Sequence, residues 1–181
     1  MSEGSAFYSY TLGSRPGGLT IDGDIAETAA AEPFFKEYCA TGSGHPSGFI
    51  YGWVMNDEEN LYVALDFTPD NTMDGDKDYA KVYVNTAGGL KEFKVSVPET
   101  TWGVPGFTYT DKVNYQHKVY EFKIPLSELG AQAGEQLQLA FAAYGTAAPG
   151  TTTVKLAYDP ENDRFLAVYN YFSYTDRKSV V

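Results

Sequence analysis

Short runs in which apolar and polar residues alternate recur from one end of this chain to the other. In residues 61–67 every odd position is apolar, while Tyr62 and Asp66 fall on the opposite face. A period of two is the pattern of a half-buried β-strand. Residues 49–55 read as a preceding strand, and residues 56–60 between the two runs hold no apolar side chain. The two strands are therefore predicted to form a hairpin.

The same alternation, bounded by turn residues, predicts further strands at residues 6–12, 19–22, 79–85, 90–97, 118–124, 137–144, 152–158 and 164–172. Helical patterns are scarce. Residues 25–38 are rich in Ala and Glu but contain Pro33, which predicts one or two turns of helix there. Residues 127–130 predict a single turn that Gly130 closes.

About nine short strands with almost no helix predict an all-β fold, an antiparallel β-sandwich of jelly-roll type with one or two short helical turns. Aromatic residues make up 15% of the chain, and their preference for pleated sheets supports this fold class. No linker or internal repeat divides the sequence, so residues 1–181 are expected to form a single β-sandwich domain, one module of a larger surface or secreted protein.

The balance of charge excludes several classes of partner. The chain has 13 Lys and Arg against 24 Asp and Glu, a formal net charge of −11, which disfavours nucleic acid and anionic membrane surfaces. No apolar run is long enough to insert across a bilayer, and the first residues lack the basic and apolar parts of a signal peptide. The single Cys39 has no partner for an internal disulfide, and no Cys/His cluster suits zinc.

Five carboxylates fall within one connection between strands, with Lys77 as the single cation among them: Asp66, Asp70, Asp74, Asp76 and Asp78. Crowded like charges repel one another unless a cation neutralises them, and oxygen-rich ligand sets suit Ca²⁺. The alternation of the last three predicts that they converge, with backbone carbonyls, on a calcium ion. The alternative is a solvated acidic loop that binds no ion.

Trp102 lies among Gly and Pro residues in residues 99–106, a composition that predicts a loop. Exposed loop aromatics stack on the C–H faces of sugar rings. Trp102 is therefore a candidate ligand contact, with Tyr109 and Tyr115 as companions further along the same connection. The alternative for Trp102 is a hydrophobic plug. Trp53, by contrast, lies within a predicted strand and is expected to pack in the core.

The sequence offers little for catalysis, and we expect no enzyme activity. A glycosidase needs one buried carboxyl group with a raised pKa, whereas the acidic connection reads as solvated. His117 lies far from both Cys39 and His45 in the sequence, and the nucleophile motif G-x-S-x-G is not present.

Four segments follow one another in the order and spacing of a known family. Residues 19–25 carry an "IDG" opening, and residues 56–66 read "NDEENLYVALD". Residues 74–85 begin with Asp-Gly-Asp and continue as a strand, and residues 120–130 read "YEFKIPLSELG". Together these segments resemble family-nine-like carbohydrate-binding modules, relatives of the DOMON-like sandwiches.

The resemblance implies a non-catalytic, extracellular accessory domain built as a β-sandwich, often with structural calcium and sometimes with carbohydrate in an aromatic slot. Lys81 and Asn85 replace two acidic residues of the family pattern, and the tryptophan that commonly follows the opening is absent. The fold is therefore expected to transfer better than the sugar specificity, because function depends on the site rather than the scaffold.

The leading expectation is a calcium-stabilised module that binds a glycan or polysaccharide, outside the cell or at its surface, beside other domains of the same chain. Two alternatives stay open. One is a structural or adhesin spacer of a cell-surface protein with no small ligand. The other is haem binding through Met55 and His117, as in some DOMON-like sandwiches.

Overall fold

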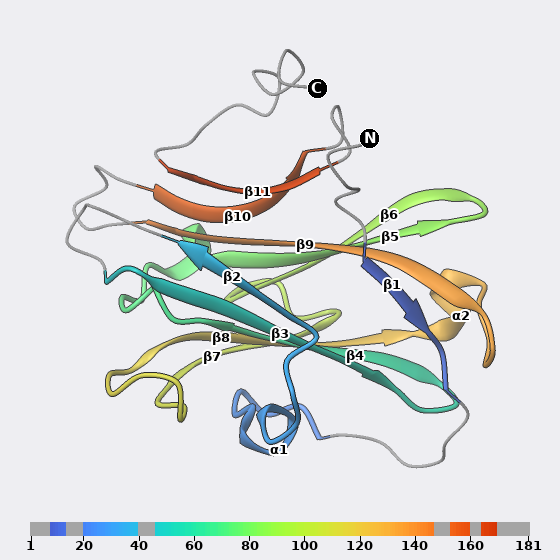
Figure 1. Cartoon of the computed structure of the whole chain (residues 1–181), viewed down its shortest axis with the longest axis horizontal. Helices are drawn as coiled ribbons and strands as arrows, with labels where there is room; N and C mark the ends of the chain where they lie inside the picture. Colours follow the sequence, from blue (N-terminus) through green and yellow to red (C-terminus); the bar gives the residue numbers. More distant parts are fainter. Residues whose placement is uncertain (1–7, 14–19, 40–45, 147–152, 160–163, 170–181) are drawn as a thin grey trace.

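Two stacked antiparallel sheets make up the described part of this chain (Figure 1). The computed structural model describes residues 8–13, 20–39, 46–146, 153–159 and 164–169. One sheet has the order β2 (Phe35–Cys39), β3 (Gly48–Asn56), β4 (Asn60–Phe67), β8 (His117–Pro125) and β7 (Gly103–Thr108). The other has the order β11 (Arg164–Tyr169), β10 (Thr153–Asp159), β9 (Gln136–Thr146), β5 (Tyr79–Thr86) and β6 (Gly89–Ser96), and β1 (Tyr8–Thr11) pairs with β9. The predicted all-β sandwich is confirmed.

The main core lies between the two sheets and follows from the alternation along their central strands. Val63 and Leu65 of β4 face Val82 and Val84 of β5 across the sandwich, and Phe122 of β8 joins them; all five side chains are buried. Because successive strand residues point to opposite faces, the residues between these positions project outward. The sequence alternation therefore fixes which side of each central strand enters the core.

A second apolar cluster lies on the outer face of the five-stranded sheet. The short helix α1 (Ala26–Ala29) lies on that face, on the side turned away from the six-stranded sheet (Figure 1). Trp53, Ala64 and Val119 of the sheet pack there against Ile25 and Ala29. Trp53 is 1% exposed, and its indole Nε1 donates to the carbonyl oxygen of Ala31 at 2.9 Å. Trp53 is buried as expected, but beneath α1 rather than between the sheets.

The helical prediction for residues 25–38 is correct only at its start. Helix α1 covers four residues, and Phe35–Cys39 forms edge strand β2. Pro33 ends helical propagation, because it lacks an amide hydrogen, and Phe35 then pairs with Gly52 of β3. The turn predicted at residues 127–130 is confirmed: α2 (Leu126–Leu129) ends at Gly130, whose φ of 62° is left-handed. No described helix is long and apolar enough to cross a membrane.

Two further predictions, one of a strand and one of a loop, need correction. The described part of residues 19–22 contains no strand. Residues 99–106, predicted as a loop, lead into edge strand β7, which contains Pro105. A proline is accepted there because an edge strand has one side whose amides need no partner strand. Parts of the predicted terminal strands lie outside the described residues: 6, 7, 152 and 170–172.

The segment around Gly23 packs directly on the backbone of β7. A Cβ atom on Gly106 would lie 2.2 Å from the carbonyl oxygen of Gly23, so only glycine fits at position 106. Gly23 itself has a φ of 89°, a conformation that favours glycine. The Oε1 atom of Glu121 accepts the amide hydrogens of Asp22 and Gly23, each at 2.8 Å. The "IDG" opening is therefore a loop that β7 and β8 hold in place.

Replacing the indole beneath α1 tests whether the second cluster contributes to stability. Trp53→Ala is expected to lower the free energy of unfolding by about 3–5 kcal/mol, as for other buried aromatic deletions. Urea unfolding followed by circular dichroism measures this. Tyr38→Ala, at a side chain that is 55% exposed on β2, is the control and should change stability by about 0.5 kcal/mol or less. Equal effects of the two substitutions would contradict a structural role for this cluster.

Candidate metal centre and ligand site

Three carboxylates of the acidic connection converge at one end of the sandwich, between the end of β4 and the start of β5. Ligand atoms of Asp70, Asp74 and Asp78 all lie within 4.8 Å of one another. The short 3₁₀ helix η1 (Gly75–Lys77) turns the chain between the last two. The amide of Asp74 donates to Oδ2 of Asp78 at 2.9 Å, and the Thr72 hydroxyl donates to Oδ2 of Asp74 at 2.6 Å. We call Asp70, Asp74 and Asp78 the carboxylate trio.

Two members of the trio are buried, contrary to the solvated loop that the sequence suggests. Asp70 is 2% exposed and Asp78 is fully buried. Burial, and next the charge of Asp78, raise the pKa of Asp70 to about 8. The Oδ2 atom of Asp70 has no hydrogen-bond partner among the described residues. A buried carboxylate oxygen of this kind is costly unless it is protonated or bound to a cation.

Lys118 is the buried cation beside the trio. It is 3% exposed on β8, and its backbone amide donates to the carbonyl oxygen of Asp70 at 2.9 Å. Burial lowers the pKa of Lys118, and the three carboxylates of the trio oppose that shift. When all four groups are ionised, their charges leave two negative charges uncompensated, which one divalent cation balances. Clustered carboxylate oxygens are the donors that calcium prefers, so the residues present fit a calcium ion.

The other two predicted metal ligands lie elsewhere. Asp76 is exposed in η1. Asp66 is fully buried, but it lies on the outer face of β4, where it bonds to His117. The structure thus brings three of the five predicted carboxylates together and separates Asp66 and Asp76 from them.

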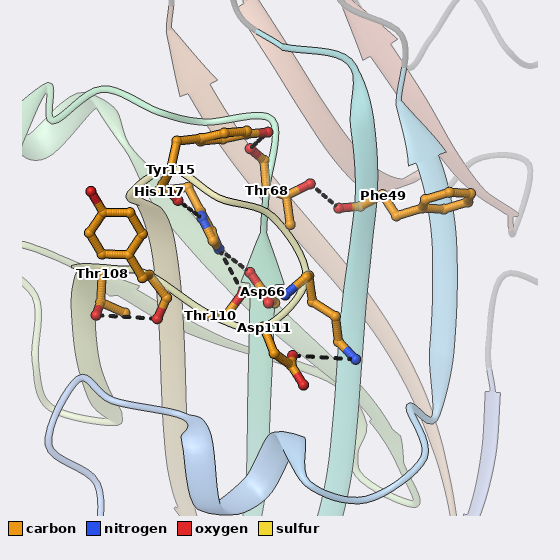
Figure 2. Close-up of polar contacts among 10 residues, drawn as sticks. Phe49, Asp66, Thr68, Thr108, Thr110, Asp111, Tyr115 and His117 are labelled. Carbon is orange, nitrogen blue, oxygen red and sulfur yellow. Dashed lines mark hydrogen bonds and ion pairs between the residues drawn. The ribbon is translucent and has the colours of Figure 1, made fainter.

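Asp66 and His117 make a buried side-chain contact (Figure 2). One ring nitrogen of His117, Nε2, makes a short hydrogen bond to Oδ1 of Asp66. The other, Nδ1, lies 3.0 Å from the carbonyl oxygen of Tyr115. A carbonyl oxygen only accepts, so Nδ1 carries a hydrogen and donates it to Tyr115. The two hydrogen bonds of the ring hold the β7–β8 connection on the sheet.

Both nitrogens of the His117 ring are thus occupied, which leaves neither available to coordinate haem iron. His45, the second histidine of the chain, lies outside the described residues. The arrangement around His117 therefore does not support the haem-binding alternative.

The three aromatic residues predicted as ligand contacts do not form one surface. Trp102 is half-buried and meets Phe93 edge-on, with ring centroids 5.2 Å apart. Tyr109 is 62% exposed at the other end of β7, about 20 Å away at 3.3 Å per strand residue. Tyr115 donates its hydroxyl to the carbonyl oxygen of Thr68 at 3.0 Å, as Figure 2 shows. Among the three, Tyr109 has the side chain most open to a ligand.

The sequence patterns do not indicate that the side chains of His117 and Lys118 are buried at this end of the sandwich. They raise His117 only as a haem ligand or as a partner for Cys39 in catalysis, and Lys118 only as the first residue of a strand. The only sequence signal is that the two basic residues are consecutive at the start of an apolar strand. Consecutive strand residues face opposite sides, so such a pair supplies one basic side chain to each face of the sheet.

Comparison with known proteins yields a match in fold. No protein-family model matches the chain, and no curated protein does. A solved family 9 carbohydrate-binding module from Caldicellulosiruptor kristjanssonii, in complex with cellotriose, is 13% identical and has a TM-score of 0.52. The match covers 92% of this chain and 86% of that one.

A second structure of a family 9 module from the same organism, in complex with glucose, gives a similar result. It is 14% identical, with a TM-score of 0.53 over 93% of this chain and 88% of that one. The resemblance seen in the sequence motifs is therefore confirmed at the level of fold. This chain shares the fold of the family 9 carbohydrate-binding modules, at low sequence identity.

Proposed function

We propose that this chain is a non-catalytic glycan-binding module that acts outside the cell or at its surface and is stabilised by calcium. The observation that carries the proposal is the agreement in fold, over more than nine-tenths of the chain, with modules solved in complex with cellotriose and glucose. Tyr109 adds an exposed aromatic side chain of the kind that sugar rings stack on.

Calcium has a structural role in this proposal. The three carboxylates of the trio lie on one segment, the β4–β5 connection, so a cation bound by them would hold that connection in one conformation beside Lys118. The carboxylate oxygens of Asp70, Asp74 and Asp78 would be its protein ligands. A cation that binds only the folded state raises stability by mass action.

The rival function is a structural spacer that binds no small ligand. The half-buried position of Trp102 against Phe93 favours it, because an indole packed in this way supports the fold rather than a sugar ring. The two functions differ in one measurable property, which is binding to any glycan at all.

Removing calcium is expected to destabilise the protein. An extracellular module with a dissociation constant of about 10⁻⁴ to 10⁻³ M gains about 1.4–2.7 kcal/mol at roughly 10 mM calcium. For a domain of this size that corresponds to a rise of about 3–10 °C in Tm. Thermal melts in EDTA and in calcium measure the difference.

Two matched variants locate the calcium effect. Asp70→Asn removes a buried ligand of nearly the same shape and should abolish the calcium-dependent shift. Asp76→Asn removes the same charge from an exposed position in the same loop and should leave the shift unchanged. Identical melting temperatures with calcium and with EDTA in the unmodified protein would refute the calcium proposal.

Screening the protein on a glycan array, with and without EDTA, tests glycan binding itself. Tyr109→Ala is expected to reduce binding at least tenfold, since truncating an aromatic side chain that stacks on a ligand costs about 2 kcal/mol or more. Trp102→Ala distinguishes the two interpretations of the Trp102 side chain, a ligand contact and a hydrophobic plug. A variant that loses binding but keeps its Tm supports the predicted ligand contact, whereas a lowered Tm supports the plug. An array with no bound glycan would favour the spacer.

A further inference from the structure

A cavity lies on the outer face of the five-stranded sheet, between α1 and the β7–β8 connection. Its volume is about 210 Å³. One water molecule occupies about 30 Å³ of liquid, so the cavity has the volume of about seven waters and accepts one six-membered sugar ring. Its floor is formed by Ile25, Ala26, Ala29 and Ala30, and its polar wall by Tyr109, Thr110, Asp111 and Asp24.

Both walls of the cavity are held in place from behind. On the α1 side, Oδ1 of Asp24 accepts the amide hydrogen of Ala26 at 3.0 Å, and the preceding loop is fixed on Glu121. On the other side, the Thr110 hydroxyl lies 3.4 Å from Nε2 of His117, whose hydrogen bond with Asp66 is buried. Asp111 extends from this connection (Figure 2). The two carboxylates therefore face a cavity that exists without a ligand.

The polar groups of the lining favour a ligand that brings hydrogen-bond donors and positive charge. Asp24 and Asp111 are exposed and contribute carboxylates, and among the described lining residues none is a cation. Lys112 pairs its ammonium with Oδ1 of Asp111 at 3.7 Å, and the same ammonium lies over the rings of Tyr51 and Trp53, at 5.0 and 5.7 Å from their centroids. The two carboxylates and this one lysine leave one negative charge at the cavity. A protonated amine forms stronger hydrogen bonds to a carboxylate than a hydroxyl group does.

We infer that this cavity binds one amino-sugar unit, with Tyr109 against the ring and the protonated amine between Asp24 and Asp111. The inference rests on the proposed glycan-binding function and names the chemical class that the site selects. Sugar hydroxyls donate to the remaining carboxylate oxygens, and the apolar floor contacts the C–H face of the ring. Acetylation of the amine removes the charge on which the selectivity depends.

Titration of the full chain with three monosaccharides, followed by amide NMR shifts, tests this inference. Glucosamine at pH 6.5 is expected to shift the amides of residues 24–30 and 109–111. It should bind about tenfold more tightly than glucose or N-acetylglucosamine, because only glucosamine adds a charge-assisted hydrogen bond. The preference should shrink in 1 M salt, which screens exposed charges. Equal affinity for all three sugars would overturn the amine selectivity.

Variants locate the site. Asp24→Asn and Asp111→Asn should each weaken glucosamine binding about tenfold. In the first of these variants, the side-chain amide oxygen introduced at position 24 can still accept the hydrogen bond of the Ala26 amide. Glu128→Gln, at an exposed carboxylate on α2, is the control for charge and should bind normally. Shifts outside the cavity, or full affinity in both Asp variants, would overturn the assignment.

The outcomes separate this inference from the function on which it rests. If the protein binds neutral glycans on the array and the Asp24→Asn/Asp111→Asn double variant keeps that binding, the cavity assignment fails while glycan binding stands. If neither neutral nor amino glycans bind, and glucosamine causes no shifts, both fail.

Discussion

The pairing of β4 with β8 determines how negative charge is distributed at one end of this sandwich. Asp66 lies opposite Val119 in that ladder, and Phe67 lies opposite Lys118. Because side chains alternate between faces, His117 projects to the outer face and Lys118 to the inner one. Each face therefore receives one basic side chain from consecutive residues of the same strand. On the outer face His117 hydrogen-bonds with Asp66, and on the inner face Lys118 offsets part of the charge of the trio.

This division explains why one acidic connection serves two purposes. On the outer face, Asp66 has a hydrogen-bond partner within the chain, His117, and this contact fixes the β7–β8 connection on the sheet. On the inner side, one lysine faces three carboxylates, two of them buried. An incomplete balance of this kind is resolved either by protonation, as the raised pKa of Asp70 indicates, or by a bound cation.

The fold could be predicted from the sequence for the central strands and for edge strands β6 and β11, but the prediction failed at edge strands β2 and β7. A central strand such as β4 pairs with a neighbouring strand on each side, so its alternation of apolar and polar residues is strict. Edge strand β2 follows a segment rich in Ala and Glu, whose composition suggests helix, and its identity depends on pairing with β3. Edge strand β7 contains Pro105, which local rules count against a strand. In both cases tertiary pairing overrides local preference.

The sequence predicts the type of group at the candidate site, a cluster of carboxylates suited to a cation. It does not predict which residues bury or contact those carboxylates. The density of aspartates indicated a cation, and Asp70, Asp74 and Asp78 do converge. Their burial was not visible, because it depends on which elements close over the loop. Asp66 and His117 are 51 residues apart, and no local pattern links them. The same holds for the cavity, whose carboxylates come from segments that meet only in the folded chain.

The trio and the outer cavity are connected through a few hydrogen bonds. The carbonyl oxygen of Thr68, at the start of the acidic connection, accepts the Tyr115 hydroxyl, and Tyr115 in turn accepts from His117 through its own carbonyl. Two residues further along, the Asp70 carbonyl accepts the amide of Lys118. A cation bound to the trio would order the segment that anchors the β7–β8 connection, and that connection carries one wall of the cavity. Order at the proposed calcium site would therefore support the shape of the outer cavity, although no ligand would contact both.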